Sequence, residues 1–436
     1  MMAVVRFPDG DDAWRSNFLN GRTPTDKSVH DAIILLTYHP DLRRRLRYNV
    51  FAKQAVITDA LPWDMGRNRC PRQLEDHDGT LACSWLEAQG LRKLGTGITK
   101  ECMVTVAKGD PYNPLTDWLT SLEWDGQERI ENWLSYYLGA EPIRDEGDEK
   151  RDISGYLRSA GPKFLISAVA RALRPGCKAD CMLVLEGPQG RLKSTSMRVL
   201  FGQDWFSDDL PDFTHQYIGL HLQGKWCFEL AELASLNRAE SNKIKAVLSR
   251  QVDRYKAPYD RFTQEHPRQC VMVGTTNPVD GYFRDPTGSR RFWPVTCGTI
   301  DLDALTRDRD QLWAEAVHCF ERGDPWWLEN GETEAAKIEQ DQRQESDPWE
   351  KVVLEAARRG SFAETSTILS ADLGIKVGDQ TRADEMRVAG ILTKFGFVRK
   401  RTMVSGSRAW RFYPTSETET EEVGHTGGAS LFDAET

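Results

Sequence analysis

One segment of the chain constrains its fold more than any other. Residues 181–202 read CMLVLEGPQGRLKSTSMRVLFG, which is a short apolar run, a break at two glycines and then a helical pattern. A buried strand that passes through a glycine-rich turn into a helix is the context in which such a loop binds phosphate. Glycines let backbone N–H groups face a phosphate, and the amino end of the helix adds a favourable dipole. The segment therefore predicts a nucleotide-binding α/β domain.

The loop at 187–194 supplies the groups that phosphate binding needs. We expect Lys193 to neutralise the β- and γ-phosphates of ATP and the Ser194 hydroxyl to ligate Mg²⁺. The usual motif has glycine directly before the lysine, but Leu192 occupies that position and Gly190 lies two residues earlier. Because leucine restricts the backbone there, we expect a reduced affinity for nucleotide; a glycine-rich turn that happens to contain Lys-Ser is the alternative interpretation. The complete candidate nucleotide-binding set is Gly187, Pro188, Gln189, Gly190, Arg191, Leu192, Lys193, Ser194 and Thr195.

Length and composition exclude several classes of protein. A chain of 436 residues is long enough for about two or three domains, and 39% hydrophobic with 28% charged residues is ordinary for a soluble protein. Its apolar runs are too short to span a bilayer, and its amino terminus lacks the pattern of a secretory signal. Nine scattered cysteines with no C-x-x-C pair indicate reduced thiols rather than disulfides or zinc ligands. We therefore expect a cytoplasmic protein with no membrane partner.

Changes of pattern along the chain predict its division into segments. Short apolar runs alternate with helical segments in the middle of the chain, which favours an α/β domain with a partly parallel sheet. Farther along, 351–415 carries twelve Lys and Arg against six Asp and Glu, and 416–436 carries six acids and no Lys or Arg. The expected segments are a flexible N-terminus (1–27), a helical N-terminal domain that serves assembly or forms a collar (28–150), the nucleotide-binding core (151–328), a solvated helix or linker (329–348), a winged-helix-like domain (349–415) and a disordered acidic tail (416–436).

Acidic and polar residues that follow the later apolar runs extend the pattern of a nucleotide-hydrolysing site. The run 224–233 ends in Glu229 and Glu232. We expect Glu229 in the magnesium shell and Glu232 at the attacking water, with the two roles exchangeable. The run 270–278 ends in Asn277, whose amide is expected to bridge the γ-phosphate and the lytic water. Acids at the carboxyl end of a parallel strand lie where such sheets place their chemistry.

Two arginines, Arg290 and Arg291, lie between a flexible turn and an apolar strand in DPTGSRRFWPV. An arginine presented in this way can act as a finger that stabilises transition-state charge across a subunit boundary. Each feature also has an ordinary structural explanation: a solvated helix start for the two acids, an Asn-Pro turn for the amide, and a surface salt bridge for either arginine. Four features in this order are more specific than any one of them, and together they favour an ATPase.

Two basic segments indicate contact with nucleic acid. The interval 249–269 is rich in Arg, Lys and Tyr, and positive charge combined with aromatic faces suits sequence-independent binding of a single strand. A solvated edge hairpin is the alternative for this interval. Near the C-terminus a helix expected at 382–396 precedes two short strands, which is the pattern of a winged helix, a module that contacts DNA or docks proteins. The candidate DNA-binding residues are Lys256, Tyr259, Arg261, Arg399, Lys400, Arg401 and Arg408.

With these residues in place, the sequence resembles the virulence-associated protein E family of phage and mobile-element ATPases, which in turn resemble superfamily three helicases. The resemblance covers about residues 105–325. The matching segments are NPLTDWLTSLEWDG (113–126), ARALRPGCKADCMLVLEGPQGRLKS (170–194), WCFELAEL (226–233), DRYKAPYDR (253–261), GTTNP (274–278) and GSRRFWPV (288–295).

The resemblance implies a core of the AAA+ type that uses ATP and Mg²⁺ and works as a ring, often a hexamer, on single-stranded DNA during replication of a phage or mobile element. It implies that the interval 249–269 holds a hairpin that projects into the ring channel. It also implies the cytoplasm of a bacterial or phage-infected host cell, with a separate primase or replication protein as a further partner. The roles that it assigns are nucleotide binding for Gly187, Gly190, Lys193 and Ser194, magnesium or water positioning for Glu229 and Glu232, sensing for Asn277 and the finger for Arg290 or Arg291.

The first hypothesis is therefore an ATP-dependent, ring-forming DNA helicase or translocase that acts on single-stranded or forked DNA. The alternative is a non-enzymatic DNA-binding or regulatory protein with a degenerate nucleotide site, which Leu192 and the winged-helix pattern motivate. A small-molecule kinase is a weaker third hypothesis, because a kinase needs neither an arginine that reaches a neighbouring subunit nor the basic interval 249–269.

Overall fold

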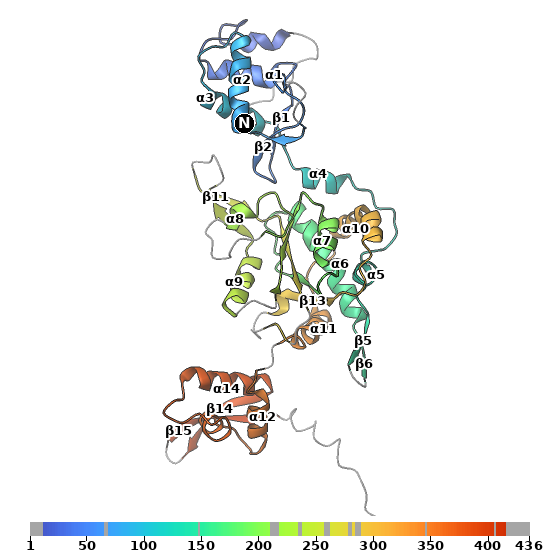
Figure 1. The fold of residues 1–436 in the computed structure, drawn as a ribbon, viewed down its shortest axis with the longest axis vertical. Coiled ribbons are helices and arrows are strands. Elements are labelled where there is room, and N and C mark those ends of the chain that lie inside the picture. Colours follow the sequence, from blue (N-terminus) through green and yellow to red (C-terminus); the bar gives the residue numbers. More distant parts are fainter. Residues whose placement is uncertain are drawn as a thin grey trace, which may run out of the picture. The chain divides into compact units, whose positions relative to one another are not determined.

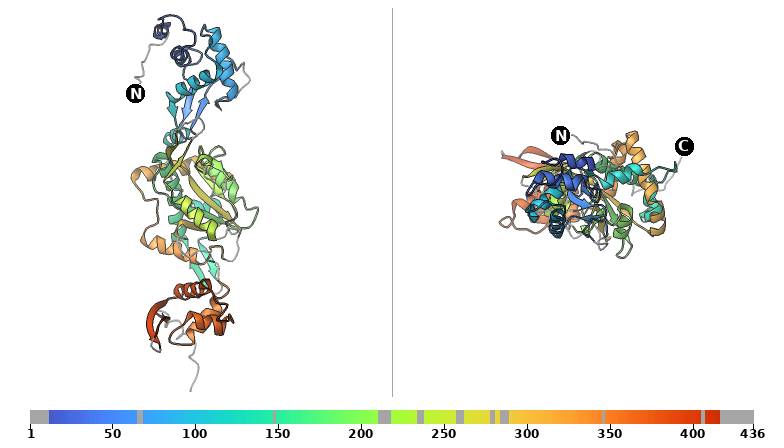
Figure 2. Two further views of the ribbon diagram at one scale, coloured as in Figure 1. Left: turned by 90° about the vertical axis from the view of Figure 1, so that its left-hand side faces the viewer. Right: turned by 90° about the horizontal axis from the view of Figure 1, so that it is seen from above.

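The computed structural model describes residues 12–64, 69–146, 149–209, 218–233, 238–256, 262–277, 281–283, 289–344, 347–404 and 407–415. The chain is divided into two compact units, Met1–Gln344 and Glu345–Thr436. Figures 1 and 2 show the elements of both units, coloured along the sequence. No described helix combines the length and the apolar character that crossing a membrane requires.

The first part of the first unit combines helices with a small sheet. Its own apolar core draws on residues from Trp14 to Ala107. The prediction of a helical domain over 28–150 missed the sheet, because its strands are only two to four residues long and leave no periodic pattern. The helices here are η1 (Asp12–Asn17), α1 (Val29–Tyr38), α2 (Asp76–Ala88) and α3 (Thr96–Lys108). The described strands, in sheet order, are β3 (Arg72–Gln73), β2 (Gln54–Ile57), β1 (Leu46–Asn49) and β4 (Pro111–Tyr112).

The segment 12–27 is packed against this core, which corrects the prediction of a flexible N-terminus for its described part. Trp14 and Phe18 are only 6% and 4% exposed. The carboxylate of Asp31, itself 0% exposed, accepts hydrogen bonds from two backbone N–H groups of the segment at 3.0 and 2.8 Å. The composition of this segment is otherwise polar. Burial of two aromatic side chains and the hydrogen bonds to one buried carboxylate nevertheless hold it against the core.

The central part of the first unit is built on a parallel sheet. In the described residues its strands lie in the order β13 (Phe292–Thr296), β7 (Met182–Glu186), β12 (Val271–Thr276), β9 (Cys227–Leu230) and β8 (Phe206–Ser207), and every neighbouring pair is parallel. The α/β fold predicted from alternating apolar runs and helical segments is confirmed. These strands are continuous apolar runs because helices cover both faces of the sheet.

Alternate residues of each strand enter two separate apolar cores. Leu183 and Leu185 of β7 join one core, whereas Met182 and Val184 join the other. Figure 1 shows the helices of the first core and those of the second on opposite sides of the sheet. The first core is covered by α4 (Pro114–Ser121), α5 (Trp133–Leu138), α6 (Ser154–Leu173), α7 (Lys193–Phe201) and α10 (Leu302–Arg322). The second is covered by α8 (Ile218–His221) and α9 (Arg238–Leu248).

Two hairpins, a 3-10 turn and a further helix complete the first unit. The hairpins are β5 (Ile143–Glu146) with β6 (Glu149–Asp152) and β10 (Val252–Tyr255) with β11 (Gln264–Pro267), both antiparallel. The helical segments are η3 (Ser289–Arg291) and α11 (Asn330–Asp341). Helix α11 packs against α6, β13 and η3, so the expectation of a solvated helix or linker over 329–348 is wrong for this helix. It is polar but still packed, because ion pairs and hydrogen bonds satisfy its buried side chains.

The second unit has its own small apolar core. Its described elements are α12 (Glu350–Arg358), α13 (Thr365–Thr367), the π-helical turn η4 (Ile368–Asp372), α14 (Arg382–Lys394) and the antiparallel hairpin of β14 (Phe397–Val404) with β15 (Ser407–Pro414). Ala363 forms an isolated bridge with Phe412 of the hairpin. The helix expected at 382–396 and the two strands after it therefore correspond to α14, β14 and β15. The predicted acidic tail, 416–436, lies outside the described residues.

Candidate nucleotide-binding site

The phosphate loop leaves the carboxyl end of β7 and enters α7 at Lys193. The Gly187 N–H donates a hydrogen bond to the Thr276 carbonyl at the end of the neighbouring strand, at 3.3 Å. Gly190 has a φ of +82°, and a Cβ added there would meet nothing within 4 Å. Glycine is favoured at this turn for its backbone conformation, since only glycine adopts positive φ without cost. The loop between β7 and α7 is exposed from Pro188 to Leu192 and open to a ligand.

Leu192 adopts a backbone conformation that normally belongs to glycine. Its φ is +61° and its ψ is 18°, in the left-handed region, and it is the residue directly before the first turn of α7. A leucine in this region costs about 1–2 kcal/mol relative to an ordinary conformation. The side chain is 46% exposed, so packing recovers little of this cost. The sequence departure therefore puts a leucine in a backbone conformation that glycine adopts more readily, which leaves the loop under local strain.

Replacing Leu192 with glycine is expected to tighten ATP binding about fivefold. Glycine removes a strain of about 1 kcal/mol that disfavours the loop conformation, so a larger fraction of molecules has the loop ready for phosphate. The measurement is titration with ATP and Mg²⁺ by calorimetry. Leu192→Ala is the matched control, because alanine removes the side-chain bulk but keeps the Cβ restriction. An equal gain from both substitutions would show that bulk, and not backbone strain, limits the affinity.

Lys193 is folded back into its own loop. Its ammonium group donates to the Gly187 carbonyl at 2.5 Å and to the Pro188 carbonyl at 3.0 Å. The residue is only 8% exposed, and this burial lowers the pKa of the ammonium group from its usual value. The two carbonyls hold the cation at the mouth of the loop, where anionic phosphate oxygens would be stronger partners than neutral carbonyls.

Glu229, at the carboxyl end of β9, lies directly against the first turn of α7. The Ser194 hydroxyl donates to Glu229 Oε1 at 2.6 Å, and the Thr275 hydroxyl donates to the same oxygen at 2.5 Å. Glu229 is 2% exposed. Its Oε2 is buried and has no hydrogen-bond partner among the residues that the structure describes. A buried carboxylate oxygen left open beside a serine hydroxyl is a donor set that suits hydrated Mg²⁺, which prefers oxygen ligands and keeps several of its waters.

The other two predicted polar residues lie at the same edge of the sheet. Asn277 is exposed and directly follows β12, whose last residue, Thr276, pairs with Glu186 immediately before the loop. Glu232 is exposed two residues beyond the end of β9 and has a φ of +55°. The carboxyl ends of parallel strands thus bring the loop, both acids and the amide to one edge, as the order of motifs predicted.

The arginines predicted as fingers lie at the opposite edge of the sheet. Arg291 Nε is 3.6 Å from Asp180 Oδ2, at the amino end of β7, and Arg290 is exposed in η3. The five residues of β7 separate this edge from the phosphate loop by roughly 15 Å. Neither arginine is therefore brought to the phosphate loop of its own chain.

The predicted DNA-binding hairpin presents one of its faces to solvent. Arg254 of β10 and Lys256, directly after the strand, are exposed, whereas the alternating residues Asp253 and Tyr255 are buried. Phe262, just before β11, is 77% exposed. Arg254 and Phe262 are further exposed residues of the hairpin that the sequence motifs did not single out, although the strand alternation predicts the exposure of Arg254. Tyr259 and Arg261 lie outside the described residues.

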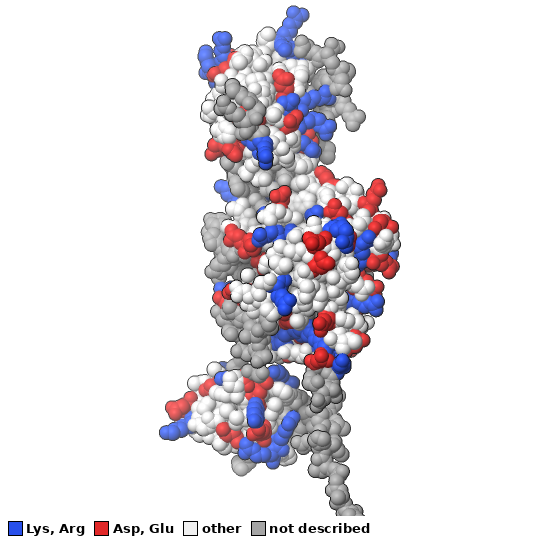
Figure 3. Space-filling model, turned by 45° about the vertical axis from the view of Figure 1, so that its right-hand side comes forward, with Lys and Arg blue, Asp and Glu red and all other residues white. Residues whose placement is uncertain are grey.

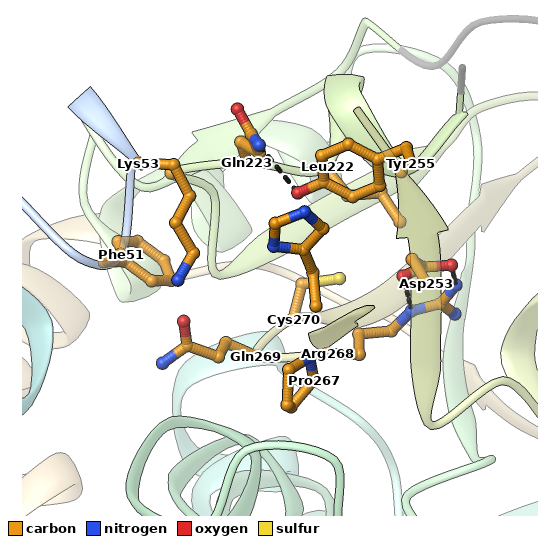
Figure 4. A pocket seen from close by; sticks show the side chains of 13 residues that line it. Phe51, Lys53, Leu222, Gln223, Asp253, Tyr255, Pro267, Arg268, Gln269 and Cys270 are labelled. Carbon is orange, nitrogen blue, oxygen red and sulfur yellow. Dashed lines mark hydrogen bonds and ion pairs between the residues drawn. The ribbon is translucent and has the colours of Figure 1, made fainter. Parts of the chain in front are cut away.

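A small cavity of about 40 Å³ lies at the root of this hairpin (Figure 4). The Gln223 amide donates to the Tyr255 hydroxyl at 2.7 Å, and the Tyr255 ring stacks on His266 with ring centroids 4.0 Å apart. Arg268 donates to both oxygens of Asp253 at 2.9 and 2.6 Å. The cavity has room for a few water molecules only. These contacts fix the base of the hairpin against the rest of the first unit.

In the second unit, Arg399, Lys400 and Arg401 are exposed on β14. The guanidinium groups of Arg399 and Arg401 lie 4.3 and 5.6 Å from the ring centroid of Trp410, which is 49% exposed. Arg408 is in β15, and its side chain lies outside the described part. On the face shown in Figure 3, basic and acidic side chains are interspersed, so the net charge of −9 does not form one continuous acidic surface there.

Comparison with known proteins agrees with the resemblance drawn from the motifs. The model of the virulence-associated protein E-like domain matches residues 119–345, more than half of the sequence. The chain therefore belongs to this family, and that prediction is confirmed. No curated protein matches the chain.

Solved structures of the C-terminal region of NrS-1 are also similar in part. The apo structure of its residues 305–718 aligns with a TM-score of 0.43 at 10% identity, over 84% of this chain and 95% of that one. Two A-form apo structures of the same region align with TM-scores of 0.41 and 0.40, each at 11% identity over 85% of this chain and 96% of the other.

Proposed function

We propose that this protein is an ATP-dependent, ring-forming DNA helicase or translocase of the AAA+ type that acts in the replication of a phage or mobile element. The observation that carries the proposal is the arrangement of Ser194, Glu229 and Thr275 beneath the phosphate loop, with Glu229 Oε2 buried and open among the described residues. A structural carboxylate would have both of its oxygens satisfied, because an unpaired buried oxygen costs stability.

The residues of the loop divide the work of hydrolysis. Lys193 exchanges the Gly187 and Pro188 carbonyls for phosphate oxygens, and the backbone N–H groups at the start of α7 donate to the same anion. Ser194 and Glu229 would hold Mg²⁺, which supplies neutralisation of phosphate charge. Asn277 and Glu232, at the same edge, orient the attacking water.

The finger role of Arg290 or Arg291 requires a neighbouring subunit. Both lie at the edge of the sheet opposite the loop, so they serve the nucleotide site of the next subunit in a ring. A hexamer with ATP at each subunit interface accommodates this arrangement. The exposed face of β10 and the basic hairpin of the second unit, as the wing of a winged helix, then contact single-stranded or forked DNA, with a separate primase or replication protein as a further partner.

Mixing two inactive variants tests whether each nucleotide site is formed by two neighbouring subunits. Lys193→Ala protein and protein with both Arg290→Ala and Arg291→Ala are each expected to have lost ATP hydrolysis. Mixed rings should regain part of it, because the arginine variant still has an intact loop and the lysine variant still has its arginines. The measurement is the rate of phosphate release over a range of mixing ratios. The matched control is a mixture of Lys193→Ala with Glu229→Gln, in which no interface has an intact loop side and no activity should return. Failure of the first mixture at every ratio would contradict a shared site.

A second candidate function is a DNA-binding or regulatory protein that does not hydrolyse ATP. The strained Leu192 favours it, because strain in the loop opposes nucleotide binding. The two functions are separated by the ATPase rate of the purified protein with and without single-stranded DNA, together with its mass in solution. A DNA-stimulated rate and an ATP-dependent oligomer support the helicase. Salt-sensitive DNA binding with no hydrolysis in either condition would favour the regulator.

A further inference from the structure

Immediately before the phosphate loop lies a buried charge network that the sequence did not reveal. Arg343, just after α11, donates to both carboxylate oxygens of Glu186, the last residue of β7, at 2.6 and 2.7 Å. The same guanidinium donates to Glu339 Oε2 at 2.8 Å. All three side chains are buried: Arg343 is 7% exposed, Glu186 6% and Glu339 0%. Two parallel bonds from one guanidinium fix both the distance and the plane of the carboxylate.

The network extends from Glu186 and Glu339 to other elements of the first unit. The hydroxyls of Tyr282 and Thr296 donate to Glu186 at 2.6 and 2.8 Å. From the β5–β6 hairpin, Arg144 and Arg151 form ion pairs with Glu339 at 2.9 and 2.5 Å. Burial by itself raises the pKa of Glu186, but the hydrogen bonds and charge of Arg343, with the two hydroxyls, hold it below its usual value. Glu186 is therefore negatively charged, and each described contact of its carboxylate is with a hydrogen-bond donor.

This network is joined to the nucleotide site through the backbone. The residue after Glu186 is Gly187, whose carbonyl holds the Lys193 ammonium group. The Glu186 carbonyl in turn accepts a hydrogen bond from the Cys297 N–H at 2.7 Å. Glu186 is thus held through both its side chain and its carbonyl at the position directly before the loop, so a change in the position of Glu186 would alter the start of the loop. On its other side, Arg343 lies at the end of the first unit, where the chain continues into the second.

We propose that Arg343 is a positioning residue of the nucleotide site, which sets the first turn of the phosphate loop through its paired hydrogen bonds to Glu186. This inference rests on the proposed ATPase function. A buried ion pair is not needed for stability, since apolar residues of similar volume commonly replace one without loss. Instead, the paired Glu186 and Arg343 fix the geometry of the loop where it begins, at the carboxyl end of β7. This matters because small displacements of groups that bind a reacting substrate strongly lower the reaction rate.

The experiment compares Arg343→Lys with Arg72→Lys in the full chain. Arg72 is a close structural match, because its guanidinium also bonds two buried carboxylates, Asp78 at 2.6 Å and Asp64 at 3.0 Å, but it lies far along the chain from the loop. Lysine keeps the charge and loses the paired geometry. ATP affinity is measured by calorimetry with Mg²⁺, and melting temperature is measured in parallel. We expect similar losses of melting temperature from both variants, but about tenfold weaker ATP binding and a raised KM only for Arg343→Lys.

Equal ATP affinity in Arg343→Lys, Arg72→Lys and the unaltered protein would overturn the proposal and leave a purely structural ion pair. If Arg343→Lys does not fold, Tyr282→Phe replaces it, because that change removes one hydrogen bond to Glu186 and preserves the ring; it should weaken ATP binding a fewfold, and no change would again overturn the proposal. The unaltered protein and Lys193→Ala separate this result from the proposed function. Absence of ATP binding in the unaltered protein would reject the function itself, whereas binding that depends on Lys193 but not on Arg343 or Tyr282 would reject this inference alone.

Discussion

Lys193→Ala is expected to lower the rate of ATP hydrolysis at least about 100-fold, the usual cost of removing one preorganised group that stabilises charge in the transition state. The Lys193 ammonium group is buried and held at the mouth of the loop by two backbone carbonyls. Alanine leaves those carbonyls with no cation and leaves the phosphate charge without its main protein partner. DNA binding should persist, because the exposed basic residues of β10 and β14 are untouched.

The loss is measured as the steady-state rate of phosphate release at saturating ATP, with single-stranded DNA present. Lys178→Ala serves as the control, since Lys178 is an exposed lysine of the same core that lies before the amino end of β7. Melting temperature and DNA affinity, measured on both variants, show whether the fold is retained. Hydrolysis by Lys193→Ala at the rate of the control would refute the assignment of the loop.

Glu229→Gln is expected to reduce hydrolysis about 100- to 1,000-fold while ATP binding is largely kept. The amide oxygen of glutamine can still accept from the Ser194 and Thr275 hydroxyls, so the packing under α7 is preserved. The substitution removes the negative charge and replaces the open oxygen by an N–H₂ group, which is a donor where a hydrated cation needs an acceptor. Catalysis therefore fails at a step after nucleotide binding.

The measurement pairs ATP affinity from calorimetry with the hydrolysis rate as the Mg²⁺ concentration is raised. Glu232→Gln is the matched comparison, because Glu232 is an exposed acid three residues along the chain. If Glu229 holds the metal and Glu232 orients the water, only the Glu229 variant should require more Mg²⁺. The reverse result would exchange the two roles. A rate for Glu229→Gln equal to that of the unaltered protein would mean that the open oxygen has no part in catalysis.

Much of the core fold could be predicted because the longer strands of its sheet are mainly apolar runs. The apolar run at the start of segment 181–202 contains all of β7 except its last residue, and the run 270–278 contains β12 entirely. A strand covered on both faces is apolar at most of its positions, so the pattern can be recognised without knowledge of its neighbours. The small N-terminal sheet and helix α11 lack this property, since the strands are short and the helix is largely polar, and hydropathy predicted neither correctly.

The residues of the candidate site likewise fall into those that the sequence could predict and those that it could not. Local motifs predicted roles for Lys193, Ser194 and Glu229, because a phosphate loop and the strand ends beside it require particular residue types at particular positions, and the structure brings Ser194 and Glu229 into contact. Thr275 was part of a Thr-Thr-Asn motif that the sequence displayed, yet only the contact with Glu229 gives it a role. Nothing in the polar stretch around Arg343 marked that residue, since its partner lies 157 positions earlier in the chain.

The sequence by itself determined the strand, the phosphate loop and the helix after it. Burial of a strand and the chemistry of a phosphate loop are local requirements, so they can be checked residue by residue in this segment. Leu192 is the position that departs from them. Only the tertiary structure decided which side chains act together. The parallel sheet order places Glu229 and Thr275 against α7 and Arg290 and Arg291 at the far edge, and an ion pair places Arg343, just after α11, against Glu186 at the base of the loop. These contacts depend on the order of the strands in the sheet and on ion pairs between segments that are distant in sequence. Neither produces a periodic hydropathy pattern that could be recognised in the sequence.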